Sequence, residues 1–105
     1  MSAASIAKQS QIQFSAQVTV AVPTIADSTS DTAVVFESAD ATVTGVTLGD
    51  NVIAAPTTAL PTDAHFVGCY VSATDTVTFE FRATKNQPVT GANRTFNVTV
   101  FDKTS

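Results

Sequence analysis

Very few side chains in this 105-residue chain could carry out covalent chemistry. It has one histidine, His65, and one cysteine, Cys69. A catalytic thiol needs a base within reach and a polar cleft. The two residues lie in a strand-like run, and the four steps between them span roughly 13 Å. We therefore do not expect them to form a Cys–His pair.

The residues around His65 and Cys69 also argue against a catalytic pair. Cys69 lies in the apolar run 66–71, which predicts a small buried hydrophobic residue. His65 directly follows a Pro-Thr-Asp-Ala segment and is expected at the surface. A single cysteine cannot form an internal disulfide, so the sequence gives no sign of a secreted disulfide scaffold.

Metal and phosphate chemistry also lack the necessary residues. A zinc-type site needs three or four nitrogen or sulfur donors. A calcium site needs clustered carboxylates, and the spacing of Asp27 and Asp31 matches no calcium loop. The four glycines are scattered singly, so no glycine-rich phosphate loop is present. We predict no catalytic, cofactor-binding or metal site, and a protein that is not an enzyme.

The strongest pattern is apolar alternation at period two, which predicts strands. Residues 77–82 and 95–100 alternate without a fault, and residues 11–22 hold six apolar positions in a row on one face. The run at residues 11–22 is long for one strand, so we expect a bend or bulge near Ala16. Residues 52–55 are continuously apolar, which predicts a strand covered on both faces.

Turn residues separate the expected strands. Residues 38–40 predict a turn, Thr74 and Asp75 predict a tight hairpin, and Leu60 is expected to reach the core from a connection. Gly45 predicts a bulge or a close approach. The predicted strands are residues 11–22, 33–37, 42–46, 52–55, 66–72, 76–83 and 94–101.

About seven strands and no helical period indicate an all-β chain. We expect a single antiparallel β-sandwich, Ig-like or jelly-roll-like, with a core built from seven phenylalanines. Residues 1–10 are small and polar and predict a flexible N-terminal arm. Residues 11–105 then form one β-sandwich domain, which suits a chain of this length.

Charge is sparse and slightly acidic. Asp, Glu, Lys and Arg make up 13 % of the chain, and the net charge is −4, whereas about 25 % charged residues is typical. Such a surface is common in proteins packed against other proteins, although threonine-rich solvated faces are also ordinary in β-sandwiches. No basic stripe is present to bind nucleic acid.

The sequence shows no features of a membrane span or of a signal peptide. No segment approaches the ~20 apolar residues of a membrane span. Residues 1–8 lack the basic and apolar regions of a signal peptide. We expect a soluble product with no membrane partner.

Three motifs follow one another in the second half of the chain. Residues 48–52 read Leu-Gly-Asp-Asn-Val, residues 71–78 read Val-Ser-Ala-Thr-Asp-Thr-Val-Thr, and residues 95–100 read Thr-Phe-Asn-Val-Thr-Val. With the Leu60-Pro61 connection, this order resembles small virion proteins of tailed bacteriophages. The resemblance covers about residues 45–103 and departs at residues 85–88, where Lys-Asn-Gln-Pro replaces an Asn-x-Thr-Gly pattern. Turn and strand residues carry it, and these define a fold better than a role.

The resemblance implies a capsid decoration or cement protein. Such a protein is made in the host cytoplasm, binds the outside of the capsid on the virion, and stabilises it. Its partners would be the major capsid protein and further copies of itself, as a homotrimer. Two alternatives remain open: a tail, fibre or spike component that binds a host surface, and a cellular Ig-like interaction module. The single tyrosine, Tyr70, and the absence of tryptophan count against a sugar-binding fibre.

Overall fold

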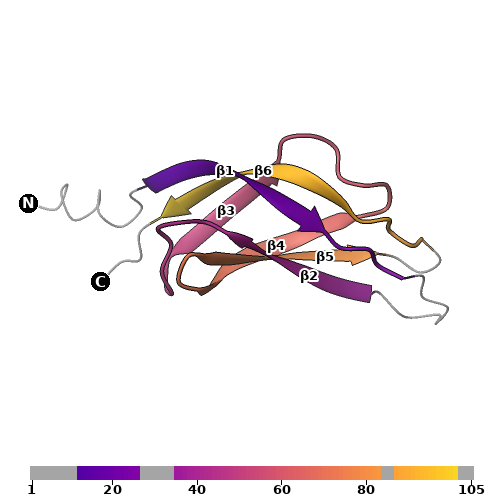
Figure 1. The fold of residues 1–105 in the computed structure, drawn as a ribbon, viewed down its shortest axis with the longest axis horizontal. Coiled ribbons are helices and arrows are strands. Elements are labelled where there is room, and N and C mark those ends of the chain that lie inside the picture. The colour runs from indigo at the N-terminus through magenta and orange to yellow at the C-terminus, as the bar shows by residue number, and fades with distance from the viewer. Residues whose placement is uncertain (1–11, 27–34, 84–86, 102–105) are drawn as a thin grey trace, which may run out of the picture.

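The chain folds into two three-stranded antiparallel sheets that pack in a sandwich-like arrangement (Figure 1). The computed structural model describes residues 12–26, 35–83 and 87–101, so the expected arm at residues 1–10 lies outside the described residues. The first sheet has the order β1-β6-β3 and the second has the order β2-β5-β4. The described strands are β1 (Ile12–Val22), β2 (Val35–Thr42), β3 (Asn51–Pro56), β4 (His65–Ala73), β5 (Thr76–Ala83) and β6 (Ala92–Phe101).

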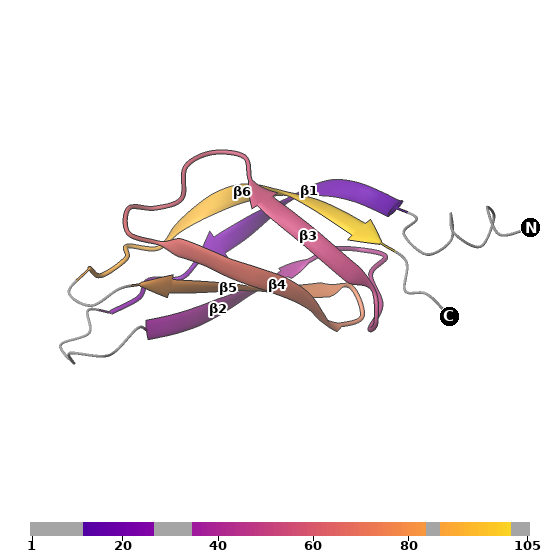
Figure 2. The same ribbon diagram turned by 180° about the vertical axis from the view of Figure 1, so that it is seen from behind.

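Most connections cross from one sheet to the other. Only β4 and β5 follow each other within a sheet, and they form the hairpin that Thr74 and Asp75 predict. The central strands are β6 and β5, so each sheet has two edge strands. Seen from behind, β3 of the first sheet and β4 of the second lie on the same side of the molecule (Figure 2).

Alternation at period two places the core as predicted. In β5 the side chains of Val77, Phe79 and Phe81 are fully buried between the sheets. In β6 the side chains of Phe96, Val98 and Val100 are fully buried as well. Because successive strand side chains point to opposite faces, the intervening polar residues point outward. The predicted all-β class is confirmed.

Four aromatic rings join the two sheets. Phe96 comes from β6 in the first sheet, whereas Phe66, Phe79 and Phe81 come from the second. The Phe96 ring centroid lies 5.2 Å from those of Phe66 and Phe79 and 6.1 Å from that of Phe81. Tilted and edge-on rings at these distances attract one another beyond their burial of apolar surface.

The expected turn at residues 38–40 and the strand at residues 42–46 are wrong. The described residues contain six strands, because β2 continues through this stretch to Thr42. Ser38 and Asp40 occupy outward strand positions, and the Thr78 hydroxyl lies 2.6 Å from Asp40 Oδ1 across the ladder. The chain turns instead at residues 44–45, where Gly45 has a φ of 103°. The first two residues of the strand expected at 33–37 lie outside the described residues.

The expectation that residues 52–55 form a strand covered on both faces is also wrong. β3 is not covered on both faces, since its residues alternate and Ile53 is 63 % exposed. Its run is apolar because outward positions hold Ile53 and Ala55 rather than polar residues. β1 has no bulge at Ala16, because its register with β6 is continuous from Phe14 to Val22 and shifts only between Ile12 and Phe14.

Two aspartates explain the first two sequence motifs. The buried Asp50 carboxylate accepts hydrogen bonds from the backbone N–H of Thr47 at 3.0 Å and from its hydroxyl at 3.3 Å. Asp75 has a φ of 60° and accepts the Gly45 N–H at 2.8 Å. These bonds close the β2–β3 connection and fasten it to the β4–β5 turn. These two motif residues therefore stabilise the turns at this end of the molecule.

At the end of the molecule away from these turns, the backbones around Ile25 and Val89 lie in close contact. Ile25 and Val89, both buried, exchange two backbone hydrogen bonds of 3.0 and 2.9 Å. Beside them, a Cβ added at Gly91 would lie 2.6 Å from the Val22 carbonyl oxygen and 2.8 Å from the Thr24 nitrogen. Only glycine allows this approach without a backbone shift.

Candidate protein-binding face

Exposed apolar side chains gather on the outer face of the second sheet. Phe36 of β2 is 58 % exposed, and Val67 and Tyr70 of β4 are 50 % and 49 % exposed. The other large exposed hydrophobic residues in the described part of the chain are Leu48, in a turn, and Ile53, on the first sheet. We call the β2-β5-β4 surface the aromatic face. It consists of Phe36, Ser38, Asp40, His65, Val67, Tyr70, Glu80 and Arg82.

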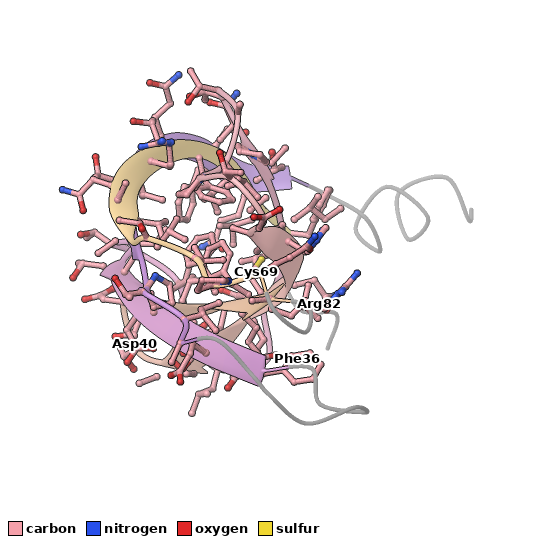
Figure 3. All side chains as sticks on the ribbon, turned by 90° about the vertical axis from the view of Figure 1, so that its right-hand side faces the viewer. Phe36, Asp40, Cys69 and Arg82 are labelled. Atoms are coloured by element: carbon pink, nitrogen blue, oxygen red, sulfur yellow. The ribbon has the colours of Figure 1, made fainter. Side chains whose placement is uncertain are left out.

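One row across this face combines a ring, a guanidinium and an imidazole. Phe36 lies opposite Arg82 in the β2–β5 ladder, and Arg82 lies opposite His65 in the β5–β4 ladder. All three point outward because Phe81 and Ala83, on either side of Arg82, are buried. Side chains that face each other in a ladder have Cβ atoms about 4.5–5.5 Å apart. Phe36 and Arg82 accordingly lie at the same end of the second sheet (Figure 3).

A second row at the other end of the face is polar and hydrogen-bonded. Thr78 stands between Asp40 on β2 and Tyr70 on β4. Its buried hydroxyl lies 2.6 Å from Asp40 Oδ1 and 2.8 Å from the Ser72 hydroxyl oxygen. This network holds the Asp40 carboxylate on β2, across β5 from the exposed Tyr70 of β4. The face therefore carries a hydrogen-bonded carboxylate on one outer strand and an exposed ring on the other.

A bulge in β4 brings Val67 onto the aromatic face. Phe66 lies opposite the buried Phe81 and Gly68 lies opposite the outward Glu80, so Val67 is the extra residue of the bulge and is 50 % exposed. Bulges redirect side chains in this way. Sequence reasoning missed Val67, although a glycine inside a strand is a signal for a bulge. It also missed that Phe36 points to solvent.

His65 and Cys69 lie on opposite faces of β4. His65 is exposed in the row with Arg82, as expected for a surface residue. Cys69 lies opposite the buried Phe79, packs against the core, and has its Sγ 3.9 Å from the Val52 carbonyl oxygen (Figure 3). Burial raises the pKa of the Cys69 thiol above its usual value. The thiol therefore stays protonated near neutral pH and is a poor nucleophile.

The charged residues of the described segments form no metal-binding cluster. No group of three His, Cys, Asp or Glu side chains in the described ranges could hold a metal ion. Glu80 lies opposite Ser38 and Gly68, so neither Arg82 nor Arg94 faces it in a ladder. Arg94 lies in the first sheet, where its Nε donates to the Ala59 carbonyl at 3.0 Å. Asp27 and Asp31 lie outside the described residues.

The outer face of the first sheet has a different chemistry. A shallow, open depression of about 410 Å³ lies over β1 and β6. Its lining is uncharged and contains no aromatic ring: Ser15, Ala16, Gln17, Asn97, Val98 and Thr99. The hydroxyl oxygens of Ser15 and Thr99 lie 3.4 Å apart across the ladder. This surface offers amide and hydroxyl groups but no anchor of the kind found on the aromatic face.

Comparisons with known proteins assign no role to either face. Comparisons with protein-family models, with curated proteins and with solved structures give no match. Within the described residues, no helix has the length and hydropathy that crossing a membrane requires. Function must therefore be argued from the two surfaces and from the motif resemblance.

Proposed function

We propose that this protein is a structural protein of a tailed-bacteriophage virion that binds the outside of the capsid and stabilises it. The observation that carries this proposal is the aromatic face, where Phe36 lies exposed beside Arg82 at one end and Tyr70 lies exposed at the other. Aromatic residues and arginine are enriched at protein interfaces and dominate their binding energy. The turn and strand motifs supply the bacteriophage part of the proposal. No enzymatic role is proposed.

The aromatic face has the rigidity that a protein-binding surface needs. Phe36 and Tyr70 stand on neighbours of the central strand β5, in a sheet whose inner side is the four-ring core. Aromatic side chains give a large contact area and have only two rotatable side-chain bonds, so little conformational entropy is lost on binding. A planar guanidinium such as that of Arg82 recognises carboxylates in a fixed geometry. We propose the major capsid protein as the partner of this face.

Capsid stabilisation follows from contact with more than one subunit. A small domain that binds two neighbouring capsid subunits adds its binding energy to the contact between them. It therefore raises the free energy needed to separate them. A second copy of this chain is also part of the proposal, and the surface it would use is argued in the next subsection.

The location of the protein on the virion tests this proposal. Antibodies against the purified protein, with gold label, are expected to decorate the heads of intact virions in electron micrographs. Virions from a deletion strain complemented with an unrelated tagged protein serve as the control for background labelling. Label confined to tails, or its absence from virions, would contradict binding to the capsid exterior.

The alternative is a tail, fibre or spike component that binds a host-surface glycan. The depression on the first sheet favours it in one respect, because Ser15, Gln17, Asn97 and Thr99 could exchange hydrogen bonds with sugar hydroxyls. Sugar sites usually add an aromatic ring for stacking, and Tyr70 lies on the opposite sheet. The aromatic face therefore supports a protein partner better than the depression supports a sugar. Label on the tails would favour the alternative.

A further inference from the structure

The strand β1 differs from the other sheet edges in having no protection against strand pairing. Two sheets of three strands have four edges, here β1, β3, β2 and β4. An edge strand presents unpaired backbone N–H and C=O groups to any other strand. Natural proteins block such edges with charges, prolines, bulges or short length.

Three of the four edges carry such devices. β3 has six residues and ends at Pro56. β2 carries two carboxylates, Glu37 and Asp40. β4 is interrupted by two register shifts, one after Phe66 and one after Val71. None of these edges offers a long, regular and neutral strand.

β1 has the opposite properties. It is eleven residues long and contains no charged residue, no proline and no glycine. Its register is regular from Phe14 to Val22, and no described strand pairs with it on the side away from β6. Its inward side chains Phe14, Ala16 and Val18 are only half-buried. The edge is therefore open along most of its length, and apolar surface is left to cover.

We propose that β1 pairs antiparallel with β1 of a second copy of this chain, about a twofold axis at Gln17. In this register all eleven residues of β1 pair with β1 of the other copy, so that Ile12 of each copy lies opposite Val22 of the other. It keeps inward residues with inward residues, so that Phe14 meets Val20 and Ala16 meets Val18. The result is a continuous six-stranded sheet across the two copies.

The chemistry of β1 suits its own copy in particular. Around a twofold axis each residue near the centre meets itself or a near neighbour, so any charge there would face a like charge. β1 has no charged residue, and its polar outward residues are Gln13, Ser15, Gln17 and Thr19. Amide and hydroxyl groups both donate and accept hydrogen bonds, so identical residues can pair.

This contact favours a dimer over the trimer that the motif resemblance implies. A ring of three copies needs head-to-tail contacts, in which one edge meets a different edge. The three other edges are blocked by a proline, carboxylates or bulges, so β1 has only another β1 as a suitable partner. The inference goes beyond the capsid role and does not depend on it, because purified protein alone tests it.

The first test places a charge on the axis. Wild-type protein is expected to be a dimer by size-exclusion chromatography with light scattering. Gln17→Lys sets two ammonium groups opposite each other and is expected to weaken dimerisation by about tenfold or more. Asn97→Lys is the matched control, because Asn97 faces Gln17 in the ladder, is also exposed and lies on the central strand β6. Equal melting temperatures for the two variants establish that both are folded.

The second test reads the register directly. Gln17→Cys is expected to form a disulfide-linked dimer under mild oxidation, because directly opposed strand residues are within disulfide range. Asn97→Cys is expected to form little, and it also measures any background from Cys69. A monomer at all concentrations, a trimer, or equal effects of the Gln17 and Asn97 variants would overturn the proposal.

Discussion

Replacing Phe96 with alanine is expected to lower the free energy of unfolding by about 3–5 kcal/mol. The Phe96 ring is fully buried and is the member of the four-ring cluster that comes from the first sheet. Its removal opens a cavity at the centre of the contact between the sheets, next to Phe66, Phe79 and Phe81. Since small domains have total stabilities of about 5–15 kcal/mol, the loss is large. Urea unfolding followed by circular dichroism measures it.

Phe36→Ala is the matched control for this prediction. It removes the same ring from the same kind of element, but at a position that is 58 % exposed. We expect its effect on the free energy of unfolding to stay below about 1 kcal/mol, the range of strand propensity and surface packing. Similar losses for Phe96→Ala and Phe36→Ala would mean that the inner and outer faces of the sheets are assigned wrongly.

The double variant Phe36→Ala/Tyr70→Ala is expected to weaken binding to capsid shells by about 100-fold or more. Central aromatic residues of an interface contribute about 2 kcal/mol or more each, and about 1.4 kcal/mol is a factor of ten in affinity. Both rings are about half exposed in the free protein, so both are available to a partner. Sedimentation of purified shells with increasing amounts of protein measures the affinity.

A truncation on the other sheet controls for loss of exposed apolar surface in general. Ile53→Ala shortens a side chain that is even more exposed but lies on the outer face of β3. It is expected to bind shells as wild type does. If Ile53→Ala weakens binding and the double variant does not, the capsid contact lies on the first sheet instead.

Alternation allowed the core to be predicted from sequence. The apolar positions of residues 77–82 and 95–100 are the buried ones, because the period of two is fixed by backbone geometry and does not depend on the partner strand. The hairpin at Thr74 and Asp75 was predictable for the same local reason, since Asp75 adopts the positive φ that aspartate tolerates. Leu60, expected to reach the core from a connection, does pack against it.

Long-range contacts decide the features that sequence reasoning missed. Ser38-Ala39-Asp40 reads as a turn, yet it continues β2 because Thr78, far along the chain, supplies the hydroxyl next to Asp40. The aromatic face could not be predicted either. Whether Phe36 points to the core or to solvent depends on its register with Arg82, which no local pattern contains. The outward position of Val67 likewise depends on the bulge in the β4–β5 ladder.

Heat resistance of capsid shells tests the proposed stabilising role most directly. Shells purified without this protein are heated alone, with saturating wild-type protein, and with the Phe36→Ala/Tyr70→Ala variant at the same concentration. Shell opening is followed by the access of a fluorescent dye to their interior. We expect wild-type protein to raise the opening temperature and the variant to leave it close to that of bare shells. Equal opening temperatures with and without wild-type protein would contradict a capsid-stabilising function.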